Sequence, residues 1–164
     1  MKKLVAVIGY RNSGKSTIIQ SLTGCSTKGF CDFVIDEDTK SSVFVVASSP
    51  QEDSMTEEKF RQILDSVIAK EGCSGVVIAI QPIRPHTRIS MEKIFEIVQQ
   101  VGGFKVFVFI LHPTRDNYDG KAQDIRNRLA DFNMEVRVLD ARRFSHFNAR
   151  EIQNVSNILN GSVD

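Results

Sequence analysis

Six short apolar runs limit the folds open to this chain of 164 residues. Most are continuous rather than alternating, and they are rich in Val, Ile and Phe. Such runs are typical of strands that other elements cover on both faces, as in a parallel sheet. The runs lie at residues 4–8, 33–35, 43–47, 76–80, 106–111 and 136–139. We therefore predict a mostly parallel sheet of about six strands.

Apolar residues with helical spacing separate most of these runs. The segments around residues 60–68, 91–98, 122–132 and 152–159 each place such residues on one helix face. Ser54 and Glu57 have the spacing of a capping box before the first of these segments. A further helix is expected after residue 14, ending near Gly24.

Residues 25–47 leave no room for a helix between the first helix and the third strand. The second and third strands should therefore pair directly through the turn at residues 36–41. Strands that otherwise alternate with helices indicate an α/β protein. We predict one domain over residues 1–164, a three-layer sandwich with helices on both faces of the sheet.

Residues 9–17 read GYRNSGKST and join the first predicted strand to the first predicted helix. In that setting the pattern G-x-x-x-x-G-K-[ST] is typical of a phosphate-binding loop. Gly9 and Gly14 allow backbone conformations that turn N–H groups inward, and the helix N-terminus adds partial positive charge. We expect Lys15 to reach the β- and γ-phosphates and the Ser16 hydroxyl to ligate Mg²⁺. The candidate nucleotide-binding residues are Gly9, Asn12, Ser13, Gly14, Lys15, Ser16 and Thr17.

The loop resembles that of P-loop NTPases, and the element order is similar to the GTPase branch, including Ras-like and EutP-like domains. The topological resemblance covers nearly the whole chain, whereas the motif match covers residues 9–17. The resemblance implies binding of a nucleoside triphosphate, GTP or ATP, together with Mg²⁺. It also implies a catalytic role for Lys15.

The metal-binding motif of that family is altered in this chain. After the third strand the family carries D-x-x-G, whose Asp holds Mg²⁺ through water; Ser48 and Gln51 stand at those two positions here. Because serine carries no charge, support for the metal is weaker. Gln51 either positions a water molecule or is an ordinary polar loop residue.

The guanine-reading motif N-K-x-D is altered as well. His112 and Pro113 occupy the Asn-Lys positions, and Asp116 comes one residue late. The last base-contacting segment of the family has become Asp-Ala-Arg at residues 140–142, with Asp140 a candidate partner for a base amino group. Selectivity for guanine therefore does not follow from this sequence.

Several further polar residues have either a functional or an ordinary surface role. Asp36 ends an apolar run and is a candidate substitute for the missing metal-site Asp, and Thr27 is a candidate switch threonine. Arg84, Arg88 and Arg115 follow predicted strands, at the edge of the sheet where α/β proteins hold ligands. These arginines form either an anion-binding rim or a solvated surface.

Composition narrows the classes of partner. The net charge of +1 gives no field of one sign, so we expect no nucleic-acid binding. The first apolar run is too short for a secretory signal, and no stretch approaches the roughly 18 apolar residues of a membrane span. The three cysteines form no CxxC pair, and the three histidines lack metal-ligand spacing. We expect a cytoplasmic protein with reduced thiols and no membrane partner; its oligomeric state stays open.

Three functions are compatible with this sequence. The first is a GTPase-like protein that binds Mg·NTP and whose hydrolysis is weak or depends on a protein partner. The second is a small-molecule or nucleotide kinase, which would use the arginine rim to clamp the transferred group. The third is a non-catalytic interaction module that binds nucleotide without turnover. Whether the protein is an enzyme is therefore open.

Overall fold

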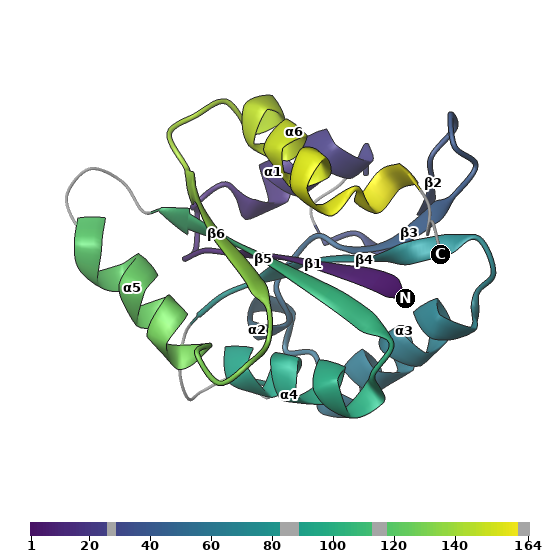
Figure 1. The fold of residues 1–164 in the computed structure, drawn as a ribbon, viewed down its shortest axis with the longest axis horizontal. Helices are drawn as coiled ribbons and strands as arrows, with labels where there is room; N and C mark the ends of the chain where they lie inside the picture. Colours follow the sequence, from purple (N-terminus) through teal and green to yellow (C-terminus); the bar gives the residue numbers. More distant parts are fainter. Residues whose placement is uncertain (26–28, 83–88, 113–117, 161–164) are drawn as a thin grey trace.

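A twisted sheet lies between two layers of helices in the computed structural model (Figure 1). The model describes residues 1–25, 29–82, 89–112 and 118–160. The elements are β1 (Lys2–Ile8), α1 (Lys15–Thr23), β2 (Cys31–Ile35), β3 (Ser42–Val46), α2 (Pro50–Asp53), α3 (Glu57–Ala69), β4 (Cys73–Ile80), α4 (Met91–Val101), β5 (Phe104–His112), α5 (Tyr118–Arg128), β6 (Glu135–Asp140), α6 (Ser145–Ser156) and the 3₁₀ helix η1 (Ile158–Asn160). The predicted three-layer α/β architecture with a mostly parallel, six-stranded sheet is confirmed.

The strand order of the sheet is β2-β3-β4-β1-β5-β6. β2 pairs antiparallel with β3, as predicted, and the other neighbouring pairs are parallel. β1 is therefore central, with β4 on one side and β5 on the other. Since the carboxyl ends of β1, β3, β4, β5 and β6 share one edge, the segments that follow these strands gather there.

Two hydrophobic layers hold the helices against the sheet. Alternate residues of the central strands point to opposite faces, as a pleated sheet requires: Leu4, Ala6 and Ile8 pack with α3, α4 and α5, whereas Val5 and Val7 pack with α1 and α6. Figure 1 shows the same division, with α1 and α6 above the sheet and α2 to α5 below it. Burial on both faces explains the continuous apolar runs in the sequence.

Two local details differ from the expectations. The N-cap of α3 is Thr56, whose hydroxyl accepts from the Lys59 amide, and not Ser54. Ser54 instead ends α2 in a left-handed conformation with φ of 53°. The short helix α2 was not predicted, because four residues are too few to show a helical period.

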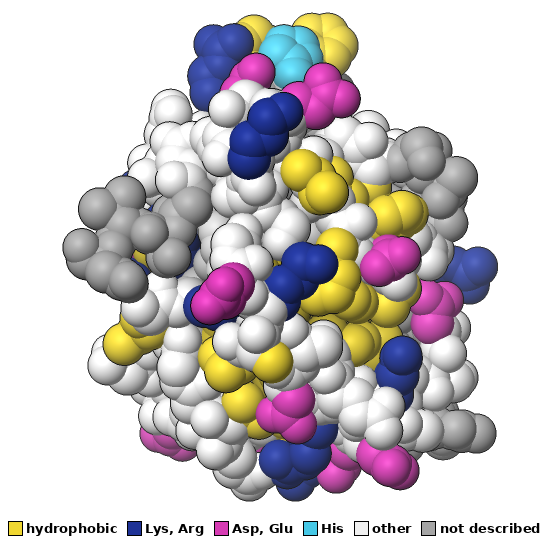
Figure 2. Space-filling view, turned by 90° about the vertical axis from the view of Figure 1, so that its right-hand side faces the viewer, with side chains coloured by type: hydrophobic (Ala, Val, Ile, Leu, Met, Phe, Trp, Pro, Cys, Tyr) yellow, Lys and Arg dark blue, Asp and Glu magenta, His cyan; other side chains and the backbone are white. Residues whose placement is uncertain are grey.

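Both signs of charge are interspersed among hydrophobic side chains on the face drawn in Figure 2. This mixture agrees with the net charge of +1. None of the helices in the described part of the chain is long and apolar enough to cross a membrane.

Candidate functional site

The segment between β1 and α1 folds back over its own first residue. The Gly9 amide donates to the carbonyl of Ile80 at the end of β4 (3.1 Å), and the Ser13 amide donates to the Tyr10 carbonyl (3.1 Å). A β-carbon on Gly9 would lie 2.3 Å from Ser13 Oγ, closer than real contacts allow. Gly14 has φ of 96°, in the region that favours glycine. Both glycines are therefore needed for this backbone path, as the sequence pattern indicated.

Helix α1 begins without a side-chain cap. Its N-cap is Gly14, and the first amide bonded into the helix is that of Ile18, which donates to the Gly14 carbonyl (3.1 Å). The amides of residues 15–17 are therefore left available at the positive end of the helix. This is the arrangement that binds phosphate at a helix N-terminus.

Lys15 is nearly fully buried beside this helix end, with 4% of its surface exposed. Its Nζ donates to the Tyr10 carbonyl (2.9 Å). Burial lowers the pKa of Lys15, and the negative charge of Glu52 acts in the opposite direction. An ammonium group carries three protons, so bonding to one carbonyl leaves it able to donate to a ligand.

Ser16 connects the loop to the end of β3. Its Oγ donates to the carbonyl of Ala47 (2.8 Å), and the Ala47 amide donates in turn to the Phe30 carbonyl (2.8 Å). The hydroxyl oxygen is thus held at the carboxyl edge of the sheet. A metal ion bound to it would have one oxygen ligand already in place.

A hollow of about 690 Å³ opens over the loop. We call it the loop hollow; its lining residues are Arg11, Asn12, Ser13, Gly14, Lys15, Ser16, Thr17, Ser48, Gln51, Glu52 and Gln81. The hydroxyl oxygen of Ser13 is buried and has no hydrogen-bond partner among the described residues. It lies against Gly9, so in this structure it faces the backbone of the loop rather than the open hollow.

Six of the seven candidate nucleotide-binding residues line the loop hollow, and Gly9 lies beneath Ser13. Their arrangement accommodates the predicted roles. The oxygen atoms that Ser16, Ser48 and Glu52 bring to the hollow are ligands of the kind that Mg²⁺ prefers. The residues present therefore fit a divalent cation. The described residues hold no separate cluster of His, Cys, Asp and Glu that could bind a metal.

Gln51 has a structural position in the wall of the loop hollow. It is 6% exposed; its Nε2 donates to the Ile89 carbonyl (3.1 Å), and its Oε1 accepts from the Gln81 amide (3.0 Å). Both ends of the amide group are thus used to join α2 to the end of β4 and the start of α4. The sequence left two roles open for Gln51. This arrangement does not support the positioning of water, and the side chain is buried rather than part of a polar loop.

Two lining residues, Gln81 and Glu52, were missed by sequence reasoning. Gln81 follows β4, which lies between β1 and β3. The segment after β4 was expected at this edge because of its arginines, but without a predicted strand order its first residue was not placed next to the loop. Glu52 lies on the unpredicted helix α2. The sequence signal for Glu52 is an acidic residue four positions after Ser48, which stands where the family has its metal-site Asp.

Asp36 does not substitute for the missing acid. β2 runs antiparallel to β3, and Ile35 pairs with Ser42, the first residue of β3. Asp36 therefore lies at the amino edge of the sheet, opposite the loop, where its carboxylate accepts from the Thr39 hydroxyl (2.6 Å). The proposal that it holds the metal is wrong, because an antiparallel strand ends at the other edge.

The far side of the same edge is the corner between β6 and α6. Asp140 accepts from the Arg142 amide and side chain through Oδ1 and from Arg142 Nη2 through Oδ2, at 2.9 to 3.0 Å. These Arg142 bonds, and more weakly the charge of His112, lower the pKa of Asp140 to about 2. The three bonds from Arg142 occupy most of the roughly four acceptor sites of the carboxylate, which disfavours Asp140 as a partner for a base amino group.

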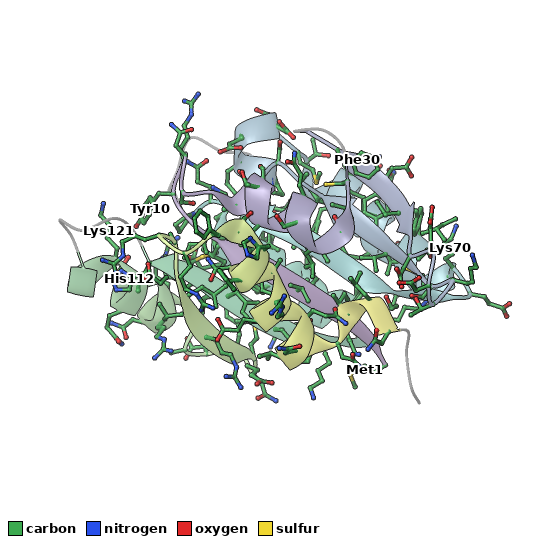
Figure 3. All side chains as sticks on the ribbon, turned by 90° about the horizontal axis from the view of Figure 1, so that it is seen from above. Met1, Tyr10, Phe30, Lys70, His112 and Lys121 are labelled. Carbon is green, nitrogen blue, oxygen red and sulfur yellow. The ribbon has the colours of Figure 1, made fainter. Side chains whose placement is uncertain are left out.

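We call this region the β6–α6 corner: Asp140, Arg142, Arg143, Phe144 and Phe147. Phe144 and Phe147 are exposed, and the His146 ring contacts both: it stacks on Phe144 at 5.8 Å and is tilted against Phe147 at 4.2 Å. In Figure 3, Tyr10, Lys121 and His112 lie together at one end of the sheet, and Met1 and Lys70 lie at the other. Lys121 Nζ lies 4.9 Å from the centre of the Tyr10 ring.

Several residues named from the sequence lie outside the described part of the chain. They are Thr27, Arg84, His86, Arg88, Pro113, Arg115 and Asp116. The switch threonine, the arginine rim and the displaced guanine-reading Asp therefore stay predictions.

One comparison with known proteins gives a match. The structure of translation elongation factor SelB from Methanococcus maripaludis, in complex with the GTP analogue GPPNHP, is similar over 94% of this chain and 33% of that one. The TM-score is 0.52 and the sequence identity is 14%. This likeness shows a GTPase-like fold, and the present chain spans a third of that longer protein. No protein-family model and no curated protein sequence matches the chain.

Proposed function

We propose that this protein is a single nucleotide-binding domain that binds Mg·NTP, GTP or ATP, through residues 9–17 and hydrolyses it slowly or with help from a partner. The observation that carries the proposal is the loop hollow itself. A buried lysine and the free amides of a helix N-terminus line it. A polyphosphate has the charge and the acceptor oxygens to satisfy both.

In this proposal each loop residue has a defined task. The amides of residues 15–17 donate to phosphate oxygens. Lys15 exchanges the Tyr10 carbonyl for the β- and γ-phosphates, and its positive charge supports charge that develops on the transferred group. Ser16 and Ser48 offer oxygens to the cation, which when bound neutralises phosphate charge. The fold likeness to SelB, which was solved with a GTP analogue, supports nucleotide as the ligand class.

Slow hydrolysis follows from the groups that face the nucleotide. Catalysis of phosphoryl transfer consists mainly of positioning and charge placement. β3 and β4, the strands next to the loop, are followed by Ser48 and Gln81, which are neutral. Both the Nε2 and the Oε1 of Gln51 are already in hydrogen bonds. These features also favour the second candidate, a cytoplasmic binding module that holds nucleotide without turning it over.

Fluorescent GTP and ATP analogues, titrated with and without Mg²⁺, test the proposal and identify the base. We expect Lys15→Ala to weaken binding by about 10- to 100-fold, the value of charged hydrogen bonds to phosphate. The exposed Lys59, on α3, offers a control with the same charge change, and Lys59→Ala should bind like the wild type. Equal affinity of Lys15→Ala and wild type would contradict the proposal. Single-turnover phosphate release then separates a slow NTPase from an inert module.

A further inference from the structure

The loop hollow contains one feature that an anion site should avoid. Glu52 lies in its lining beside the phosphate-binding groups, and among the described residues it is the acidic member of that lining. It is close enough to Lys15 for its charge to oppose the effect of burial on that lysine. A carboxylate that faces a bound polyphosphate repels it unless a cation lies between them.

The position of Glu52 is fixed by its backbone. Its amide donates to both the carbonyl and the hydroxyl of Ser49, at 3.0 and 3.3 Å, within helix α2. The residue before it, Gln51, bonds to the end of β4 and the start of α4. The carboxylate is therefore carried on an anchored turn and stays exposed at the rim of the hollow.

The other groups around the hollow leave a place for this charge. The strand ends next to the loop supply Ser48 and Gln81, which have oxygen atoms but no charge. Mg²⁺ is usually held by one or two carboxylates together with phosphates and water. In the described lining Glu52 is the residue that can provide such a carboxylate.

We propose that Glu52 holds the divalent cation of the bound nucleotide, directly or through water, and so makes nucleotide binding dependent on the metal. The inference rests on the proposed function, because the cation enters with the triphosphate. Glu52 thereby takes the place of a strand-end acid. Without metal, the same carboxylate opposes binding by repelling the phosphates, and Lys15, Arg11 and the helix N-terminus offset this repulsion in part.

The test is a binding cycle at constant ionic strength, with a fluorescent, non-hydrolysable analogue of GTP or ATP, measured in Mg²⁺ and in EDTA. Relative to wild type, we expect Glu52→Gln to bind about tenfold more weakly in Mg²⁺ and at least about threefold more tightly in EDTA. This reversal of sign is the expected signature, because a purely structural role would weaken binding in both conditions. Asp53→Asn removes a charge from the same helix outside the hollow lining and should change neither affinity by more than about twofold.

The outcomes separate this inference from the proposed function. If wild type binds neither analogue in either condition, the proposed function fails and the inference fails with it. If wild type binds and Glu52→Gln keeps the full effect of Mg²⁺, or weakens binding in both conditions, the inference alone is overturned. Glu52→Asp, which keeps the charge on a shorter side chain, should retain part of the metal dependence. If this variant folds normally but shows no metal dependence with either Mg²⁺ or Mn²⁺, which forms longer bonds, the carboxylate role is contradicted.

Discussion

The loop hollow and the β6–α6 corner lie on the same edge of the sheet but use their polar groups in opposite ways. In the hollow, the amides of residues 15–17 precede the first amide bonded into helix α1, and Lys15 donates to one carbonyl. In the corner, Asp140 accepts three bonds from Arg142, and Arg143 pairs with Glu151 at 3.3 Å. Free amides at a helix N-terminus beside a lysine indicate an anion site, whereas charged groups paired with one another indicate a structural role.

This contrast teaches more than the motif alone. The similarity of residues 140–142 to a base-contacting segment predicts that both regions belong to the ligand site. In the structure, however, the Asp140 carboxylate is paired with Arg142. The corner instead exposes the aromatic rings of Phe144 and Phe147. We therefore expect substitutions in the hollow to affect binding strongly and substitutions in the corner to affect it little.

The largest effect is expected for Gly9→Ala, which attacks the backbone of the hollow. The new β-carbon would lie 2.3 Å from Ser13 Oγ and 3.3 Å from Leu111 Cβ, so the loop must shift. We expect nucleotide affinity to fall by more than about tenfold and the free energy of unfolding to fall by about 1–3 kcal/mol, as for overpacking. Titration with the fluorescent analogue and urea unfolding measure the two effects.

The double variant Gly9→Ala/Ser13→Gly is the matched control for that prediction. It removes the Ser13 side chain, which makes the two closest contacts. Stability should recover in part, while binding stays weaker than in wild type because a glycine in place of Ser13 makes the loop backbone less fixed. Wild-type affinity in Gly9→Ala would show that the loop path seen here is not needed for the ligand.

The next largest effect is expected for Gln51→Leu, in the wall of the hollow. Leucine removes the acceptor of the buried Gln81 amide and the bond to the Ile89 carbonyl. An unsatisfied buried amide costs about 1–3 kcal/mol, so we expect a loss of that size in urea unfolding. The control is Gln62→Leu at an exposed position of α3, where the change should stay within about 0.5 kcal/mol. A mild effect at Gln51 together with lost phosphate release would instead restore its role in positioning water.

The sequence predicts the parts of this edge that depend on local pattern. Apolar runs identify the strands, and the spacing of Gly9, Gly14 and Lys15 identifies the loop that forms the hollow. Glu52 and Gln81 could not be found in this way, because their place depends on strand order and on a helix of four residues. Asp36 was misplaced for the related reason that strand direction decides which edge a residue reaches.

A smaller effect is expected for Asp140→Asn, which removes the carboxylate that pairs with Arg142 in the corner. The bonds from Arg142 lower the pKa of Asp140 to about 2, compared with an ordinary value of 3.8. A lowered pKa means that the stabilisation is present above about pH 4 and is lost as the pH falls towards 2. Because the pair is largely exposed, we expect Asp140→Asn to cost less than about 1 kcal/mol at pH 6.

Urea unfolding of wild type and Asp140→Asn between pH 6 and pH 2 checks this prediction. The difference in unfolding free energy should shrink across the interval from pH 4 to pH 2 and vanish at its lower end. Nucleotide affinity at pH 7 should be the same in both proteins. A large loss of affinity, or a change in preference between GTP and ATP, would break the contrast between the two regions and return Asp140 to the base site.

The smallest effect is expected at Phe144, and its sign is favourable. Phe144 is 73% exposed and occupies the N-cap of α6 with φ of −56° and ψ of 141°, yet it makes no side-chain cap. Serine at such a position accepts from an amide of the first turn and is typically worth about 1 kcal/mol over alanine. Loss of ring contacts with His146 and Phe147 offsets part of this gain, so Phe144→Ser should be more stable than wild type by about 0.5 kcal/mol.

Phe144→Ala removes the same ring without adding a cap and should be slightly less stable than wild type. If both variants bind nucleotide as wild type does, the rings are not part of the ligand site. If both lose affinity equally, the corner contributes an aromatic contact to the ligand, and paired polar groups alone do not show that a region has only a structural role.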